Sequence, residues 1–362
     1  MDISLGSAAD KRVTSLPPRF LAFPCVLVSS VLSVASAPQT DAVYAALDLG
    51  TNNCRMLVAR PAQEGFRVID AFSRITRLGE GLAASGVLSV TAMDRTIAAL
   101  RACADKMVRN RVTRARLVAT EACRRAANCG DFAHRVWAET GLDLEIICAK
   151  DEARLALGGC SSLMRPQYPW ALVFDIGGGS TELIWVKNAA DGPQVQGVVS
   201  LPLGVVTLAE QTGEALHSPA GYAVTVAQIA TRLAVFEAEH AITRRLLMGE
   251  VQMLGTSGTV TTLAALHLNL ERYDRSMIDG LDLRLADIAA VTTMLLGMSA
   301  SERVAHPCIG TERADLVIAG CAILEAMCRL WPLSSLRVAD RGVREGILLS
   351  MMREDAIWTR SE

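Results

Sequence analysis

Apolar and polar positions follow the same order in two distant parts of the chain. In each part an apolar run ends in an aspartate, Asp48 or Asp175, and a glycine turn with hydroxyl or amide side chains leads into a second apolar run. Each order predicts a β-hairpin with an acid at its tip. Glycine lets backbone N–H groups approach phosphoryl oxygens, and aspartates can hold the Mg²⁺ that accompanies phosphates. The two hairpins therefore predict a duplicated α/β unit with a phosphate-sized cleft between the copies.

The apolar spacing elsewhere predicts strands that alternate with helices. Further strands are expected at 66–72, 117–119, 144–147, 196–201, 251–254 and 336–338. Helices are expected at 89–109, around 124, at 131–139, from 151, over 224–239, after 258, at 313–329 and from 343. Such alternation indicates sheets covered by helices on their faces. The long offset between the two hairpins suits the duplication of a whole domain and is too long for a solenoid repeat.

Composition narrows the class of protein. The chain has 362 residues, of which 51% are hydrophobic and only 4% aromatic, so a two-domain protein with an aliphatic core is expected. The net charge of −2 provides no global basic field, and a nucleic acid partner is not expected. The ten cysteines include no Cys-x-x-Cys pair. We therefore expect reduced thiols, no zinc site and a cytoplasmic protein.

The N-terminus has the outline of a signal peptide. Basic residues precede an apolar stretch at 20–34, and small residues follow it. However, Pro24 interrupts the apolar run, and Pro38 would directly follow the cleavage site. We therefore interpret residues 1–41 as a poorly ordered extension or the product of an early start codon, with an exported protein as the alternative. Charges break every other long apolar run, so no membrane span or membrane partner is expected.

The second glycine turn, Gly177–Thr181, is the stronger of the two chemical signals. Three consecutive glycines are costly in a strand region unless the backbone conformation or a ligand requires them. A tight turn with positive φ is the alternative, but it would need only one or two glycines, so contact with phosphate is predicted. The first turn, Gly50–Asn53, consists of ordinary turn residues, so it is informative only because the second turn follows the same pattern.

Other polar residues allow two interpretations each. Arg55 and Arg124 either reach a phosphate or lie in solvent, and Glu121 has no role that the sequence reveals. The segment Gly255–Thr259, between a strand and a helix, is either an anion site or a capped helix start; taken alone, the cap is the simpler interpretation. The acids at 151–152 alone show only the usual preference for a helix N-terminus.

Five motifs in this order together resemble one family. They are Asp48–Arg55, Asp151–Arg154, Asp175–Leu183, Gly255–Thr259 and Asp340–Gly346. The chain resembles the exopolyphosphatase / guanosine pentaphosphate phosphohydrolase (Ppx/GppA) family over residues 43–352. The resemblance implies an α/β fold with two ribonuclease H-like domains of the actin/Hsp70/sugar kinase superfamily and a cleft between them. The implied domains are 42–165 and 166–356.

The resemblance also implies roles for individual residues. Glu152 would be the catalytic base that activates water, and Asp175, Glu182 and Asp48 would hold Mg²⁺. Three loops and three arginines would contact the phosphate chain: Gly50, Thr51, Asn52, Asn53, Arg55, Arg124, Gly177, Gly178, Gly179, Ser180, Thr181, Gly255, Ser257, Gly258 and Arg313. A homodimer is a family-level expectation.

The chain departs from the family pattern in a few places. Thr51 and Asn53 stand where serines are common, and Asp151 stands where glutamate is common. Long members carry an additional helical region after the Asp340–Gly346 motif. This chain ends soon after that motif, so we expect a short two-domain form and leave processivity on long chains open.

The leading hypothesis is a Mg²⁺-dependent hydrolase. It would release the terminal phosphate of inorganic polyphosphate, of guanosine pentaphosphate, or of both. An ATP-dependent kinase on the same scaffold would need an adenine pocket and a second-substrate site, and no motif locates either. A non-catalytic sensor of alarmone or polyphosphate would be expected to lack the base or the metal ligands, whereas Glu152, Asp175 and Glu182 are all present.

Overall fold

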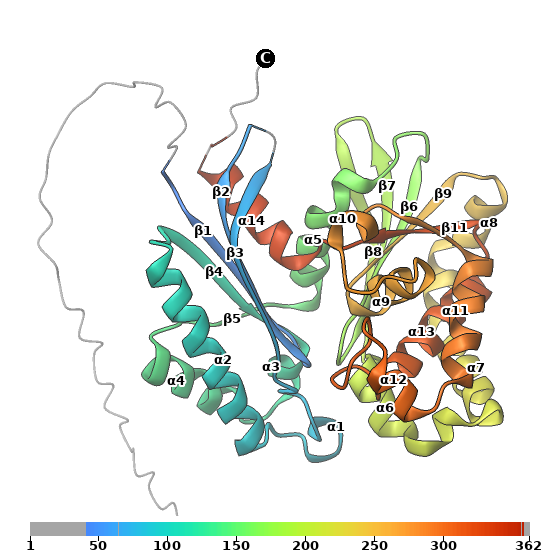
Figure 1. Ribbon diagram of the computed structural model, residues 1–362. Helices are drawn as coiled ribbons and strands as arrows, with labels where there is room; N and C mark the ends of the chain where they lie inside the picture. Colours follow the sequence, from blue (N-terminus) through green and yellow to red (C-terminus); the bar gives the residue numbers. More distant parts are fainter. Residues whose placement is uncertain (1–40, 64, 356, 358–362) are drawn as a thin grey trace, which may run out of the picture. The chain divides into compact units, whose positions relative to one another are not determined.

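The computed structural model describes residues 41–63, 65–355 and 357, and its strands form two sheets (Figure 1). The N-terminal extension predicted for 1–41 lies outside these residues except for its last position. Within the part that is described, no helix is both long and apolar enough to cross a membrane.

The first sheet has the strand order β3-β2-β1-β4-β5. β1 is antiparallel to β2 and β2 to β3, whereas β4 is parallel to β1 and β5 to β4. The bounds are β1 Tyr44–Leu49, β2 Asn53–Pro61, β3 Phe66–Ile75, β4 Arg114–Ala119 and β5 Glu145–Ile146. β1 is central, and its alternate residues enter two different apolar cores. Burial on both faces explains why this strand is a continuous apolar run.

The second sheet repeats this arrangement and adds one strand. Its order is β10-β11-β9-β6-β7-β8, with β6, β7 and β8 antiparallel in series and β9 and β11 parallel on the other side of β6. The bounds are β6 Trp170–Ile176, β7 Thr181–Ala189, β8 Gly192–Leu201, β9 Val251–Thr256, β10 Asp282–Arg284 and β11 Ser335–Ala339. The shared order of five strands confirms the predicted duplication and the two ribonuclease H-like units.

Helices cover both sheets (Figure 1). Those that lie between β3 and β6 in the chain are α1 Leu82–Ser85, α2 Val90–Arg109, α3 Glu121–Arg125, α4 Cys129–Thr140 and α5 Ala149–Cys160. Those that follow β8 are α6 Val205–Thr212, α7 Pro219–His240, α8 Ile242–Leu247, α9 Gly258–His267, α10 Arg275–Ile278, α11 Leu285–Gly297, α12 Ala300–Ala305, α13 Val317–Leu330 and α14 Val343–Glu354. Two short 3₁₀ helices span Ser161–Leu163 and Gly213–His217.

The start of α13 differs from the prediction. A helix was expected from Arg313, but α13 begins at Val317, and residues 311–316 form turns. Gly310 adopts a left-handed φ of 72°, and Arg313 N–H donates to its carbonyl in a bond that closes a turn. Arg313 therefore lies in a turn ahead of the helix, where its side chain is not confined to a helix face.

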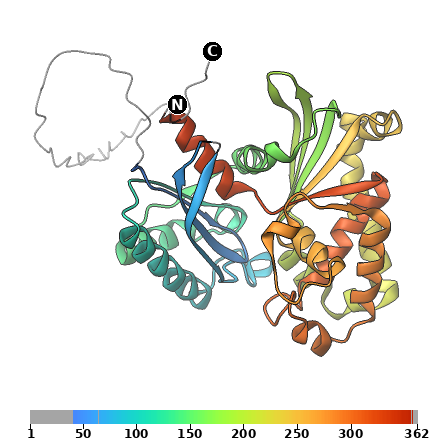
Figure 2. The same cartoon turned by 45° about the horizontal axis from the view of Figure 1, so that its top comes forward.

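The last helix of the chain returns to the first sheet. α14 packs in one core with β1, β2 and α5 (Figure 2). The two helices cross at glycines: a Cβ at Gly346 would lie 1.9 Å from Leu155 O, and one at Gly159 would lie 2.0 Å from Gly342 O. The division at 165/166 stays a prediction, but the C-terminal helix of the second predicted domain covers the sheet of the first.

Candidate active site

The turns at the tips of the two hairpins pack against each other. A Cβ added to Gly178 would lie 3.1 Å from Asn52 N, and one added to Gly179 would lie 2.5 Å from Thr51 Oγ1. None of the three glycines at 177–179 has a positive φ. The alternative of a tight turn with positive φ is therefore wrong. Close approach of the first turn is what excludes a side chain at Gly178 and Gly179.

A pocket lies where the two turns meet, and most of the predicted site residues line it. Its lining consists of Asp48, Gly50, Thr51, Asn52, Asn53, Arg55, Thr120, Glu152, Asp175, Gly177, Gly178, Gly179, Ser180, Glu182, Ser257 and Val343. These residues come from β1, β2, α5, β6, β7, the first residue of α14 and the loops around these elements. Residues far apart in the sequence, on both sheets, are thus brought together.

Four carboxylates are concentrated in this pocket. Burial, Glu182 and Asp48 raise the pKa of Asp175 to about 7. Burial and Glu182 raise the pKa of Glu152 well above its usual range, against the opposing effect of Arg124. Burial also raises the pKa of Asp48 and of Glu182. A cluster of buried acids that repel one another is a binding environment for cations.

Hydrogen bonds fix the orientation of two of these acids. Ser180 and Ser200 each donate to Glu182 Oε1 over 2.7 Å. Arg124 Nη1 donates to Glu152 Oε2 over 2.6 Å. Arg124 Nη2 donates to Glu121 Oε2 over 2.9 Å, so Glu121 gains the role that the sequence did not reveal. It holds the arginine that holds Glu152.

Two polar atoms of the first turn are buried without a partner. Thr51 Oγ1 and Asn52 Oδ1 have no hydrogen bond among the described residues, although the two residues are only 5% and 8% exposed. Buried polar atoms are nearly always hydrogen-bonded, because an unmade bond costs free energy. Both residues line the pocket, so these atoms point to a ligand that completes them.

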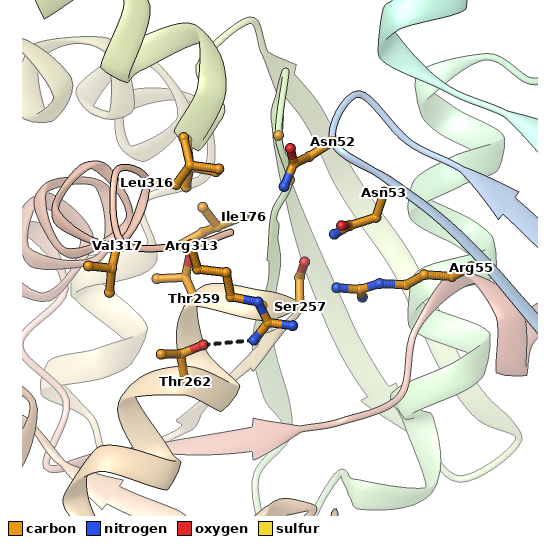
Figure 3. Close-up of a pocket in the computed structure, with 14 residues that line it drawn as sticks. Asn52, Asn53, Arg55, Ile176, Ser257, Thr259, Thr262, Arg313, Leu316 and Val317 are labelled. Atoms are coloured by element: carbon orange, nitrogen blue, oxygen red, sulfur yellow. Dashed lines mark hydrogen bonds between the residues drawn. The ribbon is translucent and has the colours of Figure 1, made fainter. Parts of the chain in front are cut away.

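An adjoining pocket contains two arginines. Arg55 and Arg313 point into it from opposite sides, as Figure 3 shows. Arg313 donates to Thr262 Oγ1 over 3.2 Å. In the part of the chain that is described, neither guanidinium has a carboxylate within ion-pair distance. Two such cations beside the glycine turns suit a polyanion.

Ser257 takes part in the site and does not cap its helix. It precedes α9, makes no capping hydrogen bond with its side chain, and has a φ of 81°. It lines both pockets. The capped-helix interpretation of Gly255–Thr259 is therefore wrong. A non-glycine residue in the left-handed region is a strained conformation of the kind that occurs at functional sites.

Three predicted phosphate-binding residues lie outside the linings of these two pockets. Thr181 Oγ1 donates to Leu203 O over 2.5 Å. Gly255 is packed against Phe174, whose ring carbon would lie 2.6 Å from an added Cβ. Arg124 is engaged by its two acids. Contact of Arg124 with phosphate stays a prediction.

The structure also adds residues that sequence reasoning missed. Ser200 bonds Glu182 from β8, and Thr120 lines the acidic pocket. Arg344, at the start of α14, partly offsets the burial that raises the pKa of Asp48, and burial lowers the pKa of Arg344 itself. Arg344 belongs to the Asp340–Gly346 motif, so the motif gave a signal for it. Ser200 had none, because only strand pairing brings it opposite Glu182.

The carboxylates suit a metal ion that is shared with a substrate. No three His, Cys, Asp or Glu side chains in the described ranges converge closely enough to hold a metal by themselves. Mg²⁺ is usually bound through one or two carboxylates together with waters and substrate phosphates. The burial and mutual repulsion of Asp48, Asp175 and Glu182 fit this mode.

Comparison with known proteins gives consistent matches along the chain. The Ppx/GppA phosphatase family model matches residues 57–355. Exopolyphosphatase 2 of Mycobacterium tuberculosis is 30% identical over 322 residues, which cover 85% of this chain and 98% of that protein. The crystal structure of an exopolyphosphatase-like protein is 28% identical with a TM-score of 0.78, covering 86% and 98% of the two chains. A Ppx/GppA family member from Aquifex aeolicus is 29% identical with a TM-score of 0.71, covering 87% and 98%.

Proposed function

The chain belongs to the Ppx/GppA phosphatase family, and from this premise we propose that it is an exopolyphosphatase. It would release the terminal phosphate of inorganic polyphosphate by attack of water. One observation carries the proposal: two glycine turns meet beside buried acids and two arginines that lack acidic partners among the described residues. The family membership that the five motifs indicated is confirmed.

Glu152 is proposed as the general base. Phosphoryl transfer depends mainly on positioning and on neutralising charge, with one residue that orients or deprotonates water. A base works best when its pKa lies close to the working pH, and burial beside Glu182 moves the pKa of Glu152 in that direction. Arg124 holds one of its carboxylate oxygens. The other can accept a proton from water.

The phosphate chain is proposed to lie along both pockets. The turns at 50–53 and 177–180 would bind the terminal phosphoryl group, and Arg55 and Arg313 would bind the phosphates that follow. One or two of the carboxylates of Asp48, Asp175 and Glu182 would hold Mg²⁺ together with water and the phosphate oxygens, whose charge the ion would neutralise when bound. The negative global charge of the protein makes this local arrangement of cations necessary for attracting a polyanion.

A second substrate class has an observation of its own. The wall of the arginine pocket includes the apolar side chains Ile176, Val205, Leu316 and Val317. A bare phosphate chain offers nothing for these side chains to contact, whereas a nucleoside does. Guanosine pentaphosphate is therefore the second candidate substrate. A homodimer and a cytoplasmic location stay predictions.

Phosphate release by the purified full-length chain tests the proposal. The assay compares long-chain polyphosphate, guanosine pentaphosphate and ATP, each with Mg²⁺ and again with a chelator. Release from polyphosphate that is much faster than from ATP would support the exopolyphosphatase. Binding of polyphosphate without release would favour the sensor, and phosphoryl transfer from ATP to an acceptor would favour the kinase.

A further inference from the structure

The loop between β3 and α1, residues 76–81, supports the first phosphate turn directly. Thr76 N and Arg77 N donate to Asn52 O over 2.8 and 3.0 Å, and Gly79 N donates to Thr51 O over 2.9 Å. Arg95 of α2 holds the other side of the loop by donating to Thr76 O over 3.0 Å. The position of the turn at 51–52 therefore depends on the position of this loop.

The same loop makes two polar contacts with the second half of the chain. Arg77 Nη2 lies 3.0 Å from Asp315 Oδ2, and Gly81 N donates to Glu210 Oε1 over 2.9 Å. We call these two contacts, Arg77 with Asp315 and Gly81 with Glu210, the clasp. The residues around them line a separate pocket at this place. Arg77 also has a positive φ of 47°, which is a strained backbone conformation for a non-glycine residue.

Each contact of the clasp ends on an element that carries part of the phosphate site. Asp315 lies in the 311–316 turns, two residues from Arg313. Glu210 lies on α6, whose first residue, Val205, donates its N–H to Gly177 O over 2.9 Å. The clasp thus connects the support of the first glycine turn to the support of the second and to the arginine turn.

We propose that Arg77 is a positioning residue whose ion pair with Asp315 aligns the two halves of the phosphate site. This inference rests on the proposed function of the cleft. Because the side chains of Arg77 and Asp315 are 35% and 51% exposed, the pair favours this alignment of the two halves without fixing it rigidly. Exposed pairs contribute little, so removing this one should change affinity by about twofold to fivefold.

The test uses two single variants, Arg77→Met and Asp315→Asn, in the full-length protein. Deuterium exchange of a peptide containing Gly81 reports on the clasp without any substrate. We expect faster exchange in both variants, and a KM for polyphosphate that rises by about twofold to fivefold at low salt with little change in kcat. Arg77→Lys retains the charge, so its KM should lie close to that of the unaltered protein.

The Asp315→Asn variant distinguishes positioning from direct binding. If Arg77 bound the polyanion itself, removal of its competing carboxylate would lower the KM, whereas the clasp predicts a higher KM. If the clasp acts as proposed, the KM of the double variant should be no higher than that of the more severely affected single variant, because either substitution breaks the same pair. Additive effects in the double variant would contradict the proposal.

A matched pair within one half supplies the control. Arg101 of α2 and Glu139 of α4 form an ion pair over 2.5 Å on the first half alone. Arg101→Met should leave both the Gly81 exchange and the KM unchanged. Unaltered exchange in Arg77→Met and Asp315→Asn would overturn the inference. If the unaltered protein releases no phosphate from either substrate, the proposed function fails, while exchange at Gly81 still decides whether the clasp exists.

Discussion

Glu152, the proposed base, combines two properties that a buried base needs. Burial and Glu182 raise its pKa, which makes its carboxylate a stronger base than that of an exposed glutamate. Arg124 holds it in one orientation, and Glu121 holds Arg124 in turn. Removal of either supporting side chain would leave a charge buried without its partner, which is costly. The orientation of the Glu152 carboxylate therefore depends on two supporting side chains, those of Arg124 and Glu121.

The first prediction concerns the base itself. Glu152→Gln keeps the shape of the side chain and removes its ability to accept a proton. We expect kcat for polyphosphate to fall by about 10²- to 10⁴-fold, with polyphosphate binding largely retained. Asp151→Asn, at the exposed neighbouring position on α5, is the control and should leave kcat nearly unchanged. Near wild-type kcat in Glu152→Gln would remove Glu152 from this role.

The second prediction concerns Asp175, whose pKa is about 7 in the folded protein and 3.8 without the fold. The folded state binds a proton that the unfolded state has already lost, so stability falls as pH rises from 3.8 to about 7. In metal-free protein, Asp175→Asn should therefore raise the free energy of unfolding at pH 8 by up to about 4 kcal/mol. At pH 4 the change should be near zero.

The same variant should lose activity or need more Mg²⁺. Paired denaturant titrations at the two pH values, with a chelator present, measure the first effect, and phosphate release against Mg²⁺ concentration measures the second. Unchanged metal dependence would argue against Asp175 as a ligand. A variant less stable than wild type at pH 8 would argue against repulsion among the buried acids.

At the scale of elements, the crossing of α5 and α14 positions Glu152, the proposed base. Gly346 of α14 lies so close to α5 that an added Cβ would be 1.9 Å from Leu155 O, one turn from Glu152. Backbone atoms cannot move aside as a flexible side chain can, so a methyl group there must push the two helices apart. Glu152, which lies on α5, would then shift relative to the rest of the pocket.

The third prediction follows from this crossing. Gly346→Ala should lower the free energy of unfolding by about 1–3 kcal/mol and also reduce kcat, as expected of overpacking next to the site. Gly297→Ala, at the end of α11, is the control, because no atom lies within 4 Å of an added Cβ. That change should leave activity intact and stability equal or higher. Denaturant unfolding and phosphate release are the measurements.

Elements with strong local signals were predictable from the sequence. The helix expected at 89–109 is α2, which begins after Ser89, and the Ser89 hydroxyl accepts the Ala92 N–H as a cap. The short strand β10 and the short helices α10 and α12 were not predicted, since three to six residues show little periodicity. The early start expected for α13 was wrong because a left-handed Gly310 leads the chain into turns.

The sequence identified most residues of the candidate site but few of the contacts between them. The glycine turns and the acids were identified, because their residue types are unusual after apolar strands. The sequence did not reveal why glycine is required at 178 and 179. The backbone of Asn52 and the side chain of Thr51, from a distant turn, leave no room there for a side chain. Contacts between residues more than a hundred positions apart leave no pattern in a single local stretch of sequence.

At the scale of the whole molecule, the charge distribution sets how a polyanion is attracted. The net charge of −2 repels it at long range, so we expect its attraction to depend on the arginine pocket. Arg55 and Arg313 are free of carboxylate partners within the described residues, unlike Arg77 or Arg124. Charges of this kind act over about 8–10 Å at ordinary salt. Their contribution should therefore appear mainly in KM and in its dependence on salt.

The fourth prediction tests this. Arg313→Met should raise the KM for polyphosphate by about tenfold at low salt and weaken the rise of KM with added salt. Arg329→Met is the control: Arg329 lies at the other end of α13, is exposed, and pairs with Glu325. Steady-state kinetics at several salt concentrations measure both the KM at low salt and its dependence on salt. An equal rise in KM for the two variants would show that overall charge, and not the arginine pocket, attracts the phosphate chain.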